Sequence, residues 1–289
     1  MNIKDSARAL LLYLAITPTD TTSARVLYTA YLRAACALML RPDRFLTVGQ
    51  FLTRDIQVKC HGMAALARAH CEDLGYYAHT AKPHTFAWFH PKQEQIVVDC
   101  GSSVGLFTLL ALQAGSRVFA FEPNPSAFAI LQHNVARNGL KGANLINKGL
   151  GERKGELLLY ARRRLTGTTS YRKGWADWVT QYDETEEIHT TVTTLDAELF
   201  NVPHVHWLLI DVEGFDFQVL TGAKELLKRT DYVIIEVSHC DREKVLELLH
   251  LAGFTELARG PSEVVAQYFL FLKSPSGGTR RPEDFATSI

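Results

Sequence analysis

A glycine-containing turn near the middle of the chain carries the first pattern that could bind a ligand. The segment 97–105 runs from an apolar stretch into Asp99 and then through the spacing D-x-G-x-x-x-G into a helical pattern. Gly101 lets the backbone turn sharply and approach a ligand without a clash from a Cβ atom. Such a turn lies at the carboxyl end of a strand, where open α/β sheets bind ligands. The alternative is an ordinary strand-to-helix turn.

An acidic residue follows at the spacing that a ribose-binding group would need. Glu122 ends the next apolar stretch, 118–121, and lies 23 positions after Asp99. In nucleoside-binding folds, an acidic side chain about 20 residues beyond the glycine turn accepts hydrogen bonds from the ribose. Taken alone, Glu122 would suit the protein surface equally well. Its position after the turn favours a nucleoside cofactor, and the missing G-x-G-x-x-G pattern argues against a dinucleotide.

The elements expected around these residues alternate between strands and helices. Strands are expected at 96–100, 117–121, 143–147, 206–211, 232–237, 254–258 and 266–272. Helices are expected between them at 106–114, 126–138, 217–227 and 244–251. This alternation predicts an α/β fold built from βαβ units, with a mostly parallel seven-stranded sheet. Two further strands, at 156–160 and 188–194, flank a polar stretch that we interpret as an insertion over the sheet edge.

The first 90 residues have a different pattern, which predicts a helical N-terminal extension. Apolar residues recur at helical spacing over 6–16, 23–40 and 58–74, and no strong strand is expected before 84–89. We therefore expect a helical extension or cap over 1–90 and a ligand-binding domain over 91–273. The remainder, 274–289, is rich in Pro, Gly and Arg and is expected to be a flexible tail.

The composition restricts the classes of partner and compartment. Apolar residues make up 47% of the 289 residues and the formal net charge is zero, which argues against a dedicated nucleic-acid binder because neutralising phosphates needs a basic excess. Five widely spaced cysteines without a C-x-x-C pair fit reduced thiols in the cytoplasm better than disulfides or zinc. The start of the chain lacks a clean signal-peptide pattern, and no stretch is long enough to cross a bilayer.

The order of the motifs resembles the FkbM family of class I methyltransferases. D-x-G-x-x-x-G is followed by F-E-P, T-L-D at 194–196, I-D-V-E-G at 210–214, V-L-x-G-A at 219–223 and I-E at 235–236. The resemblance covers 96–237, and its most specific part is I-D-V-E-G followed by V-L-x-G-A. It implies a Rossmann-like fold, S-adenosyl-L-methionine as the cofactor, and methyl transfer to a hydroxyl of a small natural product, sugar or glycan.

The resemblance also implies where the cofactor would lie. The residues around its methionine part and in the loop beside it would be Asp99, Gly101, Ser102, Ser103 and Gly105. The residues around its ribose and adenine would be Glu122, Pro123, Asn124, Lys148 and Gly149. Asp211, which would also contact the cofactor, and Glu213 would lie at the tip of the fourth strand beside the transferring methyl group. Phe215 and Asp216 replace the usual Ala-Glu of the family, so the resemblance does not identify the substrate.

Methyl transfer to a hydroxyl needs alignment of donor and acceptor and is helped by a general base. The candidate bases, near the carboxyl ends of the fourth and fifth strands, are Asp211, Glu213, Glu236 and His239. A histidine is suited to proton transfer near neutral pH, but His239 could instead end a strand and face water. The same four residues could bind a divalent metal, although this donor set suits magnesium or manganese at most moderately, and no metal is expected.

The expected insertion holds basic residues interleaved with aromatic ones. They are Arg162, Arg163, Arg164, Tyr171, Arg172, Lys173, Trp175 and Trp178, and an acidic run over 183–187 follows. This composition could bind nucleic acid, clamp a phosphorylated or carboxylated small molecule, or form a plain surface loop. We favour a loop that covers the substrate, because long loops in compact domains are often functional lids.

Three alternatives to a small-molecule or glycan O-methyltransferase stay open. They are an RNA or protein methyltransferase, a non-catalytic methyltransferase-like module that binds a partner, and another nucleoside-cofactor enzyme such as a dehydrogenase. The chain lacks N/D-P-P-Y/F after the fourth strand and lacks a Pro-Cys pair, which disfavours methylation of adenine amino groups and of cytosine C5. We expect a cytoplasmic enzyme, and the pattern leaves the oligomeric state open.

Overall fold

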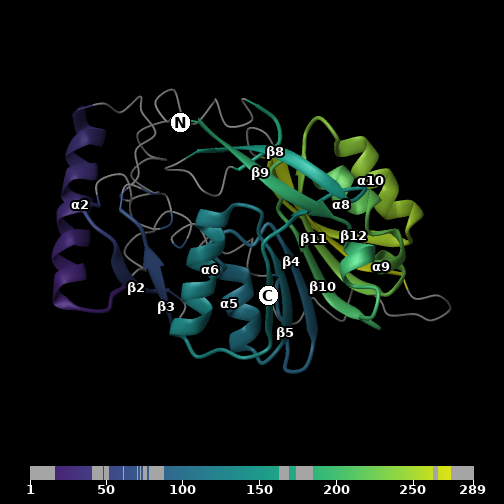
Figure 1. Ribbon diagram of the computed structural model, residues 1–289, viewed down its shortest axis with the longest axis horizontal. Helices are drawn as coiled ribbons and strands as arrows, with labels where there is room; N and C mark the ends of the chain where they lie inside the picture. The colour runs from purple at the N-terminus through teal and green to yellow at the C-terminus, as the bar shows by residue number, and fades with distance from the viewer. Residues whose placement is uncertain are drawn as a thin grey trace.

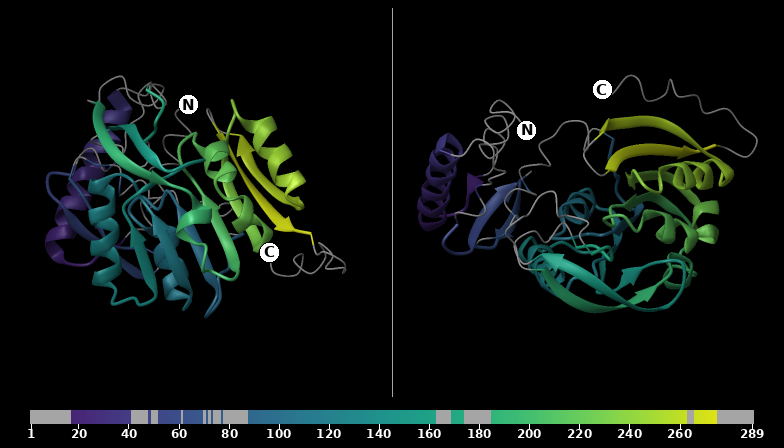
Figure 2. Two further views of the ribbon diagram at one scale, coloured as in Figure 1. Left: turned by 45° about the vertical axis from the view of Figure 1, so that its right-hand side comes forward. Right: turned by 90° about the horizontal axis from the view of Figure 1, so that it is seen from above.

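The computed structural model describes residues 17–40, 48, 52–60, 62–69, 71, 73, 77, 88–162, 169–173, 185–262 and 266–274. Figure 2 shows α2 (Thr21–Leu40) at one end of the molecule and the C-terminal strands β12 (Phe254–Ser262) and β13 (Ala266–Lys273) at the other. None of the described helices is long and apolar enough to span a membrane. The helix expected at 6–16 and nearly all of the expected tail lie outside the described residues.

A seven-stranded sheet forms the centre of the molecule (Figure 1). Its strands, in spatial order, are β12, β13, β11 (Thr230–Ser238), β10 (Val205–Ile210), β4 (Ile96–Cys100), β5 (Arg117–Phe121) and β6 (Ala143–Ile146). The strands from β11 to β6 are parallel, whereas β13 runs antiparallel to both of its neighbours. The expected mostly parallel sheet of seven strands is therefore confirmed. Strand order reverses between β4 and β10, which is where ligands bind in open α/β sheets.

Helices cover both faces of this sheet (Figure 1). α5 (Leu106–Gln113) and α6 (Pro125–Arg137) lie on one face, and α8 (Asp216–Thr221), α9 (Lys224–Lys228) and α10 (Arg242–Leu251) on the other. Every residue of β4 is buried, and its alternate side chains enter two different core clusters. The single helix expected at 217–227 is instead α8 and α9, with Gly222 between them. A Cβ atom on Gly222 would lie 2.0 Å from the Gly151 carbonyl oxygen, so the chain packs too closely there for a side chain.

A second, smaller sheet lies across the central one. It contains β7 (Gly149–Leu150), β9 (Thr185–Thr193) and β8 (Gly155–Arg162), in that spatial order. The strands expected at 156–160 and 188–194 are thus confirmed, and β8 pairs antiparallel with β9 along its whole length. A short helix, α7 (Leu195–Glu198), follows β9 and begins where the Thr194 hydroxyl accepts a hydrogen bond from the Ala197 N–H.

The N-terminal part contains strands that the sequence pattern did not predict. α2 confirms the helix expected at 23–40, but β1 (Thr17–Pro18), β2 (Ile56–Cys60) and β3 (Met63–Ala67) form an antiparallel sheet. The helix expected over 58–74 and the absence of strands there were wrong. Burial alternates strictly along β3, which is the period of a strand, and Gly62 adopts a positive φ of 81° in the turn before it. The alanines of β3 also suit a helix, so spacing alone could not decide.

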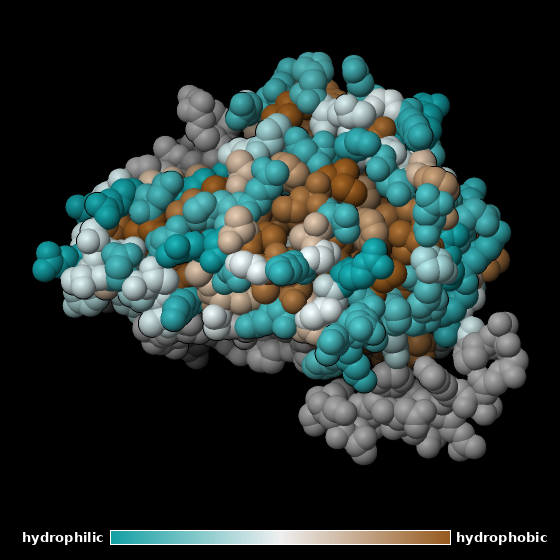
Figure 3. Space-filling view, turned by 60° about the horizontal axis from the view of Figure 1, so that its bottom comes forward, coloured by the Kyte–Doolittle hydropathy of each residue, from teal (hydrophilic) through white to brown (hydrophobic). Residues whose placement is uncertain are grey.

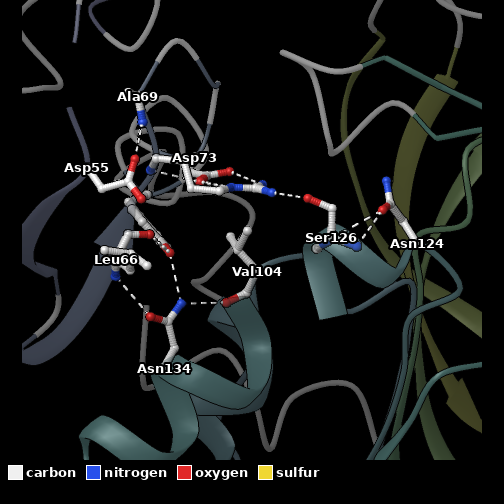
Figure 4. A network of polar contacts seen from close by, with 11 residues as sticks. Asp55, Leu66, Ala69, Asp73, Val104, Asn124, Ser126 and Asn134 are labelled. Carbon is white, nitrogen blue, oxygen red and sulfur yellow. Dashed lines mark hydrogen bonds and ion pairs between the residues drawn. The ribbon is translucent and has the colours of Figure 1, made fainter. Parts of the chain in front are cut away.

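The N-terminal sheet is joined to the central domain by hydrogen bonds from α6. The Asn134 side chain accepts from the Leu66 N–H at 2.9 Å and donates to the Val104 carbonyl at 2.9 Å (Figure 4). Asn138 accepts from the Ala64 N–H at 2.8 Å. One hydrophobic cluster contains residues from α2, β2 and β3 together with Val104 and Ile130 of the central domain. The two parts therefore share a core.

The surface is mixed in polarity. Figure 3 shows hydrophobic side chains gathered in the middle of one face and bordered by hydrophilic ones. The large hydrophobic side chains that are exposed among the described residues are Tyr28, Leu32, Phe200 and Leu251. Tyr28 and Leu32 are four positions apart on α2, so they lie on one side of that helix.

Candidate functional site

A cavity of about 710 Å³, its open mouth included, lies at the carboxyl ends of β4, β5 and β10. Seven residues expected to bind a cofactor line it, and these are Gly101, Ser103, Glu122, Pro123, Lys148, Gly149 and Asp211. Glu213, which follows β10 together with Asp211, also lines it. Four others, Asp99, Ser102, Gly105 and Asn124, are not among its lining residues. The structure therefore brings eight of the sequence-based candidates to one cavity.

The turn after β4 is compressed against its neighbours. Gly101 and Gly105 adopt positive φ angles of 84° and 96°, and Ser103 does so at 49°. A Cβ atom on Gly101 would lie 1.8 Å from the Asp211 carbonyl oxygen, and one on Gly105 would lie 2.4 Å from Leu131 Cδ1. Close packing onto the backbone at the end of β10 thus requires a glycine at 101, whereas at 105 the positive φ favours glycine. A positive φ at a serine costs free energy and is most often retained at ligand sites.

Glu122 directly follows β5 and is a buried carboxylate with two hydrogen bonds. One oxygen accepts from the Ser103 N–H and the other from the Asn124 N–H, each at 2.8 Å. Burial raises the pKa of Glu122 to about 7, although these two backbone hydrogen bonds act to lower it. Because each carboxylate oxygen has a second lone pair, Glu122 can still accept hydrogen bonds from a ligand in the cavity.

Three of the cofactor candidates that do not line the cavity support its walls. Asp99 accepts a hydrogen bond from the Thr108 hydroxyl at 2.5 Å, and burial raises the pKa of Asp99 to about 6. Ser102 donates its hydroxyl to the Asp99 carbonyl at 2.9 Å. Asn124 caps α6 by accepting from the Ser126 and Ala127 N–H groups. Direct contact of these residues with a cofactor stays a prediction.

Three of the four candidate catalytic residues form one cluster. Carboxylate oxygens of Asp211, Glu213 and Glu236 lie within 4.8 Å of one another. Glu213 adopts a positive φ of 51° in the tight turn after β10. Like charges this close are stabilised by a cation, which could be a metal ion or a positively charged group of a ligand. His239 is exposed in the turn after β11 and does not line the cavity, so its proposed role stays a prediction.

Sequence reasoning missed a tyrosine that belongs to this cluster. The Tyr268 hydroxyl donates a hydrogen bond to Asp211 Oδ2 at 2.6 Å, and Tyr268 pairs with Glu236 in the β11–β13 register. Paired residues of neighbouring strands project from the same face of the sheet. The motif gave no signal for Tyr268, because its position depends on the antiparallel insertion of β13 beside β11.

Part of the insertion also lies at the cavity. Thr169 and Tyr171 line it, together with Leu157 and Leu159 of β8. The Tyr171 ring packs against Phe215, with ring centroids 4.3 Å apart. Other residues of the expected covering loop, namely Arg163, Arg164, Trp175 and Trp178, lie outside the described residues. The described part agrees with a loop that covers the cavity.

Comparison with known proteins identifies the family. The Methyltransferase FkbM domain matches residues 99–256, which is more than half of the chain. The chain belongs to this family. Together with the sheet order, the match confirms the Rossmann-like class I methyltransferase fold expected from the sequence.

Three relatives are similar to this chain over more than half of its length. Methyltransferase 1 of Beauveria bassiana is 29% identical over 58% of this chain and 75% of its own length. The 31-O-demethyl-FK506 methyltransferase FkbM of Streptomyces tacrolimicus is 29% identical over 56% and 74%. The hexuronic acid methyltransferase AglP of Haloferax volcanii is 26% identical over 58% and 67%. The chain is therefore similar to methyltransferases.

Proposed function

We propose that this FkbM-family protein is an S-adenosyl-L-methionine-dependent O-methyltransferase that acts on a hydroxyl of a small natural product, sugar or glycan. One observation carries the proposal. The lining of the cavity contains the buried, hydrogen-bonded carboxylate of Glu122. It also contains the carboxylates of Asp211 and Glu213, which follow β10. Such a cavity can hold a nucleoside and also a positively charged reacting centre.

The residues of the cavity fit the cofactor. Its lining combines apolar side chains, such as Phe121 and Leu150, with the acidic side chains of Glu122 and Asp211, which is the mixture typical of small-molecule sites. Glu122 would accept hydrogen bonds from the ribose hydroxyls. The apolar side chains of Phe121 and Leu150 would contact the adenine beside Pro123. Lys148 forms a 2.8 Å ion pair with Glu198, so the cavity does not have an unpaired cation there that would disfavour a sulfonium.

The carboxylate cluster would perform two tasks. When bound, S-adenosyl-L-methionine supplies a methyl group on a positively charged sulfur, which a nucleophile displaces in line. The charges of Asp211 and Glu213 would complement that sulfur electrostatically. One of these carboxylates, or Glu236, would accept the proton of the acceptor hydroxyl as the oxygen attacks. Tyr268 would hold Asp211 in one orientation through its 2.6 Å hydrogen bond.

An oxygen acceptor is supported by one of the relatives, and an acceptor of the sugar class is supported by another. The name of the Streptomyces tacrolimicus protein places its methyl group on an oxygen, and the Haloferax volcanii protein methylates a hexuronic acid. Both resemble this chain over more than half of its length. We carry over only the acceptor class, because identities below one third do not fix the substrate.

The cofactor is tested by calorimetric titration with S-adenosylmethionine, S-adenosylhomocysteine and NAD. We expect the first two to bind and NAD not to bind, and we expect Glu122→Ala to lose binding while Asp231→Ala, at the other end of the sheet, retains it. If folded protein binds neither methyl-cycle compound, the proposed cofactor is wrong and a non-catalytic module becomes the better explanation.

The acceptor class is tested by transfer of a labelled methyl group to panels of macrolides, sugars, glycans, RNA and proteins. We expect label on a hydroxyl of a small molecule or glycan. Asp211→Asn should lose transfer while still binding S-adenosylhomocysteine. Label on RNA or protein alone would overturn the proposed acceptor and leave the cofactor assignment intact.

A further inference from the structure

Residues 169–173 run along the cavity from its Glu122 end to its Asp211 end. At one end, the Thr169 hydroxyl accepts a 3.1 Å hydrogen bond from Asn124, which directly follows the Glu122-Pro123 pair. At the other end, the Tyr171 ring contacts Phe215, which lies just beyond Glu213. Both Thr169 and Tyr171 line the cavity. This segment, called the strap below, therefore borders both halves of the site.

The middle of the strap is tied to two other elements. Ser170 exchanges two backbone hydrogen bonds with Tyr160 of β8, at 2.7 and 3.1 Å. Its hydroxyl donates to the Glu213 carbonyl at 2.7 Å. Because β8 belongs to the smaller sheet and Glu213 follows β10 of the central sheet, the strap joins the two sheets across the cavity.

Arg172 fastens the strap to the start of α10. Its guanidinium donates to the Asp241 carboxylate at 2.6 Å, to the Tyr171 hydroxyl at 2.5 Å and to the Cys240 sulfur. The Asp241 side chain is only 8% exposed, so this ion pair is stronger than one at an open surface. Lys244 contacts the other Asp241 oxygen at 3.0 Å. Arg172 thus fixes the cavity-lining tyrosine beside it.

We propose that the strap closes over the bound S-adenosyl cofactor, with Tyr171 as a contact residue and Arg172 as the positioning residue that holds it through Asp241. The inference rests on the proposed function, since it needs the cofactor to occupy this cavity. A ligand that contacts a fixed segment leaves more slowly than one beside a segment that is free to move. The Arg172–Asp241 pair therefore slows cofactor release.

The test measures association and dissociation rates of S-adenosylhomocysteine by stopped-flow fluorescence with the full chain. We expect Arg172→Ala and Asp241→Asn each to speed dissociation about tenfold, as for the loss of a hydrogen bond to a charged group. The double variant should be no faster than Arg172→Ala, because Asp241→Asn changes a contact that the loss of Arg172 has already removed. Tyr171→Ala should also speed dissociation.

Lys244→Ala is the matched control. It removes the positive charge that pairs with the other oxygen of Asp241 but leaves the Arg172–Asp241 contact in place. S-adenosylhomocysteine should therefore dissociate from this variant at the wild-type rate. Asp241→Asn keeps the side-chain size, and the Asp241 side chain makes no capping hydrogen bond to α10, so this variant should fold even if Arg172→Ala does not.

The outcomes separate the two proposals. If the wild type does not bind S-adenosylhomocysteine, the proposed function fails and the strap proposal fails with it. If the wild type binds but Arg172→Ala and Asp241→Asn release the ligand at the rate of Lys244→Ala, only the strap proposal is overturned. If Arg172→Ala and Asp241→Asn lower the melting temperature without changing the dissociation rate of S-adenosylhomocysteine, the strap stabilises the fold and does not hold the ligand.

Discussion

Glu122 is a residue in which burial and hydrogen bonding act in opposite directions on one charge. Burial raises the pKa of its carboxyl group to about 7, and the N–H groups of Asn124 and Ser103 act to lower it. A ribose diol donates two hydrogen bonds, which the carboxylate accepts better than the carboxylic acid does, because the acid has one oxygen that carries a proton. Below the pKa of the free protein, ligand binding therefore favours release of a proton from Glu122.

This linkage predicts a pH dependence of cofactor affinity. The association constant for S-adenosylhomocysteine should rise as the pH increases towards about 7 and level off above it. Below that value it should fall by up to about tenfold per pH unit. Calorimetric titration across this pH range measures the association constant. Glu122→Gln keeps the shape of the side chain but does not titrate, so it should bind weakly and with an association constant that does not change with pH. The same slope in the Gln variant would assign the effect to Asp99, whose pKa burial raises to about 6.

Tyr268 carries a second prediction at this scale. Tyr268→Phe keeps the ring but removes the 2.6 Å hydrogen bond to the half-buried Asp211. The free energy of unfolding should fall by about 1.5 to 3 kcal/mol, the range for hydrogen bonds to charged groups. Urea unfolding at neutral pH measures this loss. Tyr28→Phe, at an exposed position of α2, should have no effect. An equal loss in an Asp211→Ala background, which has no acceptor there, would mean that the hydroxyl stabilises something else.

At the scale of elements, α6 holds β3 through two asparagines. Asn134 is fully buried, accepts from the Leu66 N–H and donates to the Tyr77 hydroxyl and the Val104 carbonyl. Asn134→Ala should lower the free energy of unfolding by about 2 to 4 kcal/mol, because buried partners are left without hydrogen bonds. Asn138→Ala should cost less, since Asn138 is only half-buried. If Asn134→Ala is as mild as Gln132→Ala on the exposed side of α6, the junction is not held by these bonds.

Elements were predictable where local pattern and tertiary structure agree. β4, β5 and β10 are short apolar runs ended by a glycine or an acidic residue, and they lie where the sequence predicted. β3 was missed because Met63–Ala67 is equally compatible with a helix, and only its pairing with β2 selects the strand. The site followed the same rule. Glu122 and Asp211 end predicted strands, whereas Tyr268 and the Arg172–Asp241 contact depend on pairings between segments far apart in the chain.

At the scale of the whole molecule, the N-terminal residues and the methyltransferase part share one core. Val104, which lies in the turn after β4, is fully buried in a cluster with Val58 and Ala65 of the N-terminal sheet. The adjacent Ser103 lines the cavity and donates its N–H to Glu122. The division at residue 90 stays a prediction as a domain boundary. Contacts across it reach the residues that hold Glu122, so we expect the N-terminal part to affect the site.

Removing that part should therefore weaken cofactor binding as well as stability. A chain beginning at Trp88, which keeps the contacts of Phe89 with Trp207 and Phe107, would expose Val104 and Ile130 to water. If the turn after β4 then adopts its binding conformation only a tenth of the time, S-adenosylhomocysteine affinity falls roughly tenfold. Calorimetry and thermal unfolding measure both effects, and residues 1–87 added as a separate chain should restore part of each. A shortened chain with full affinity and an unchanged melting temperature would mean that the site is independent of the N-terminal part, and that the bonds from Asn134 serve only to attach it.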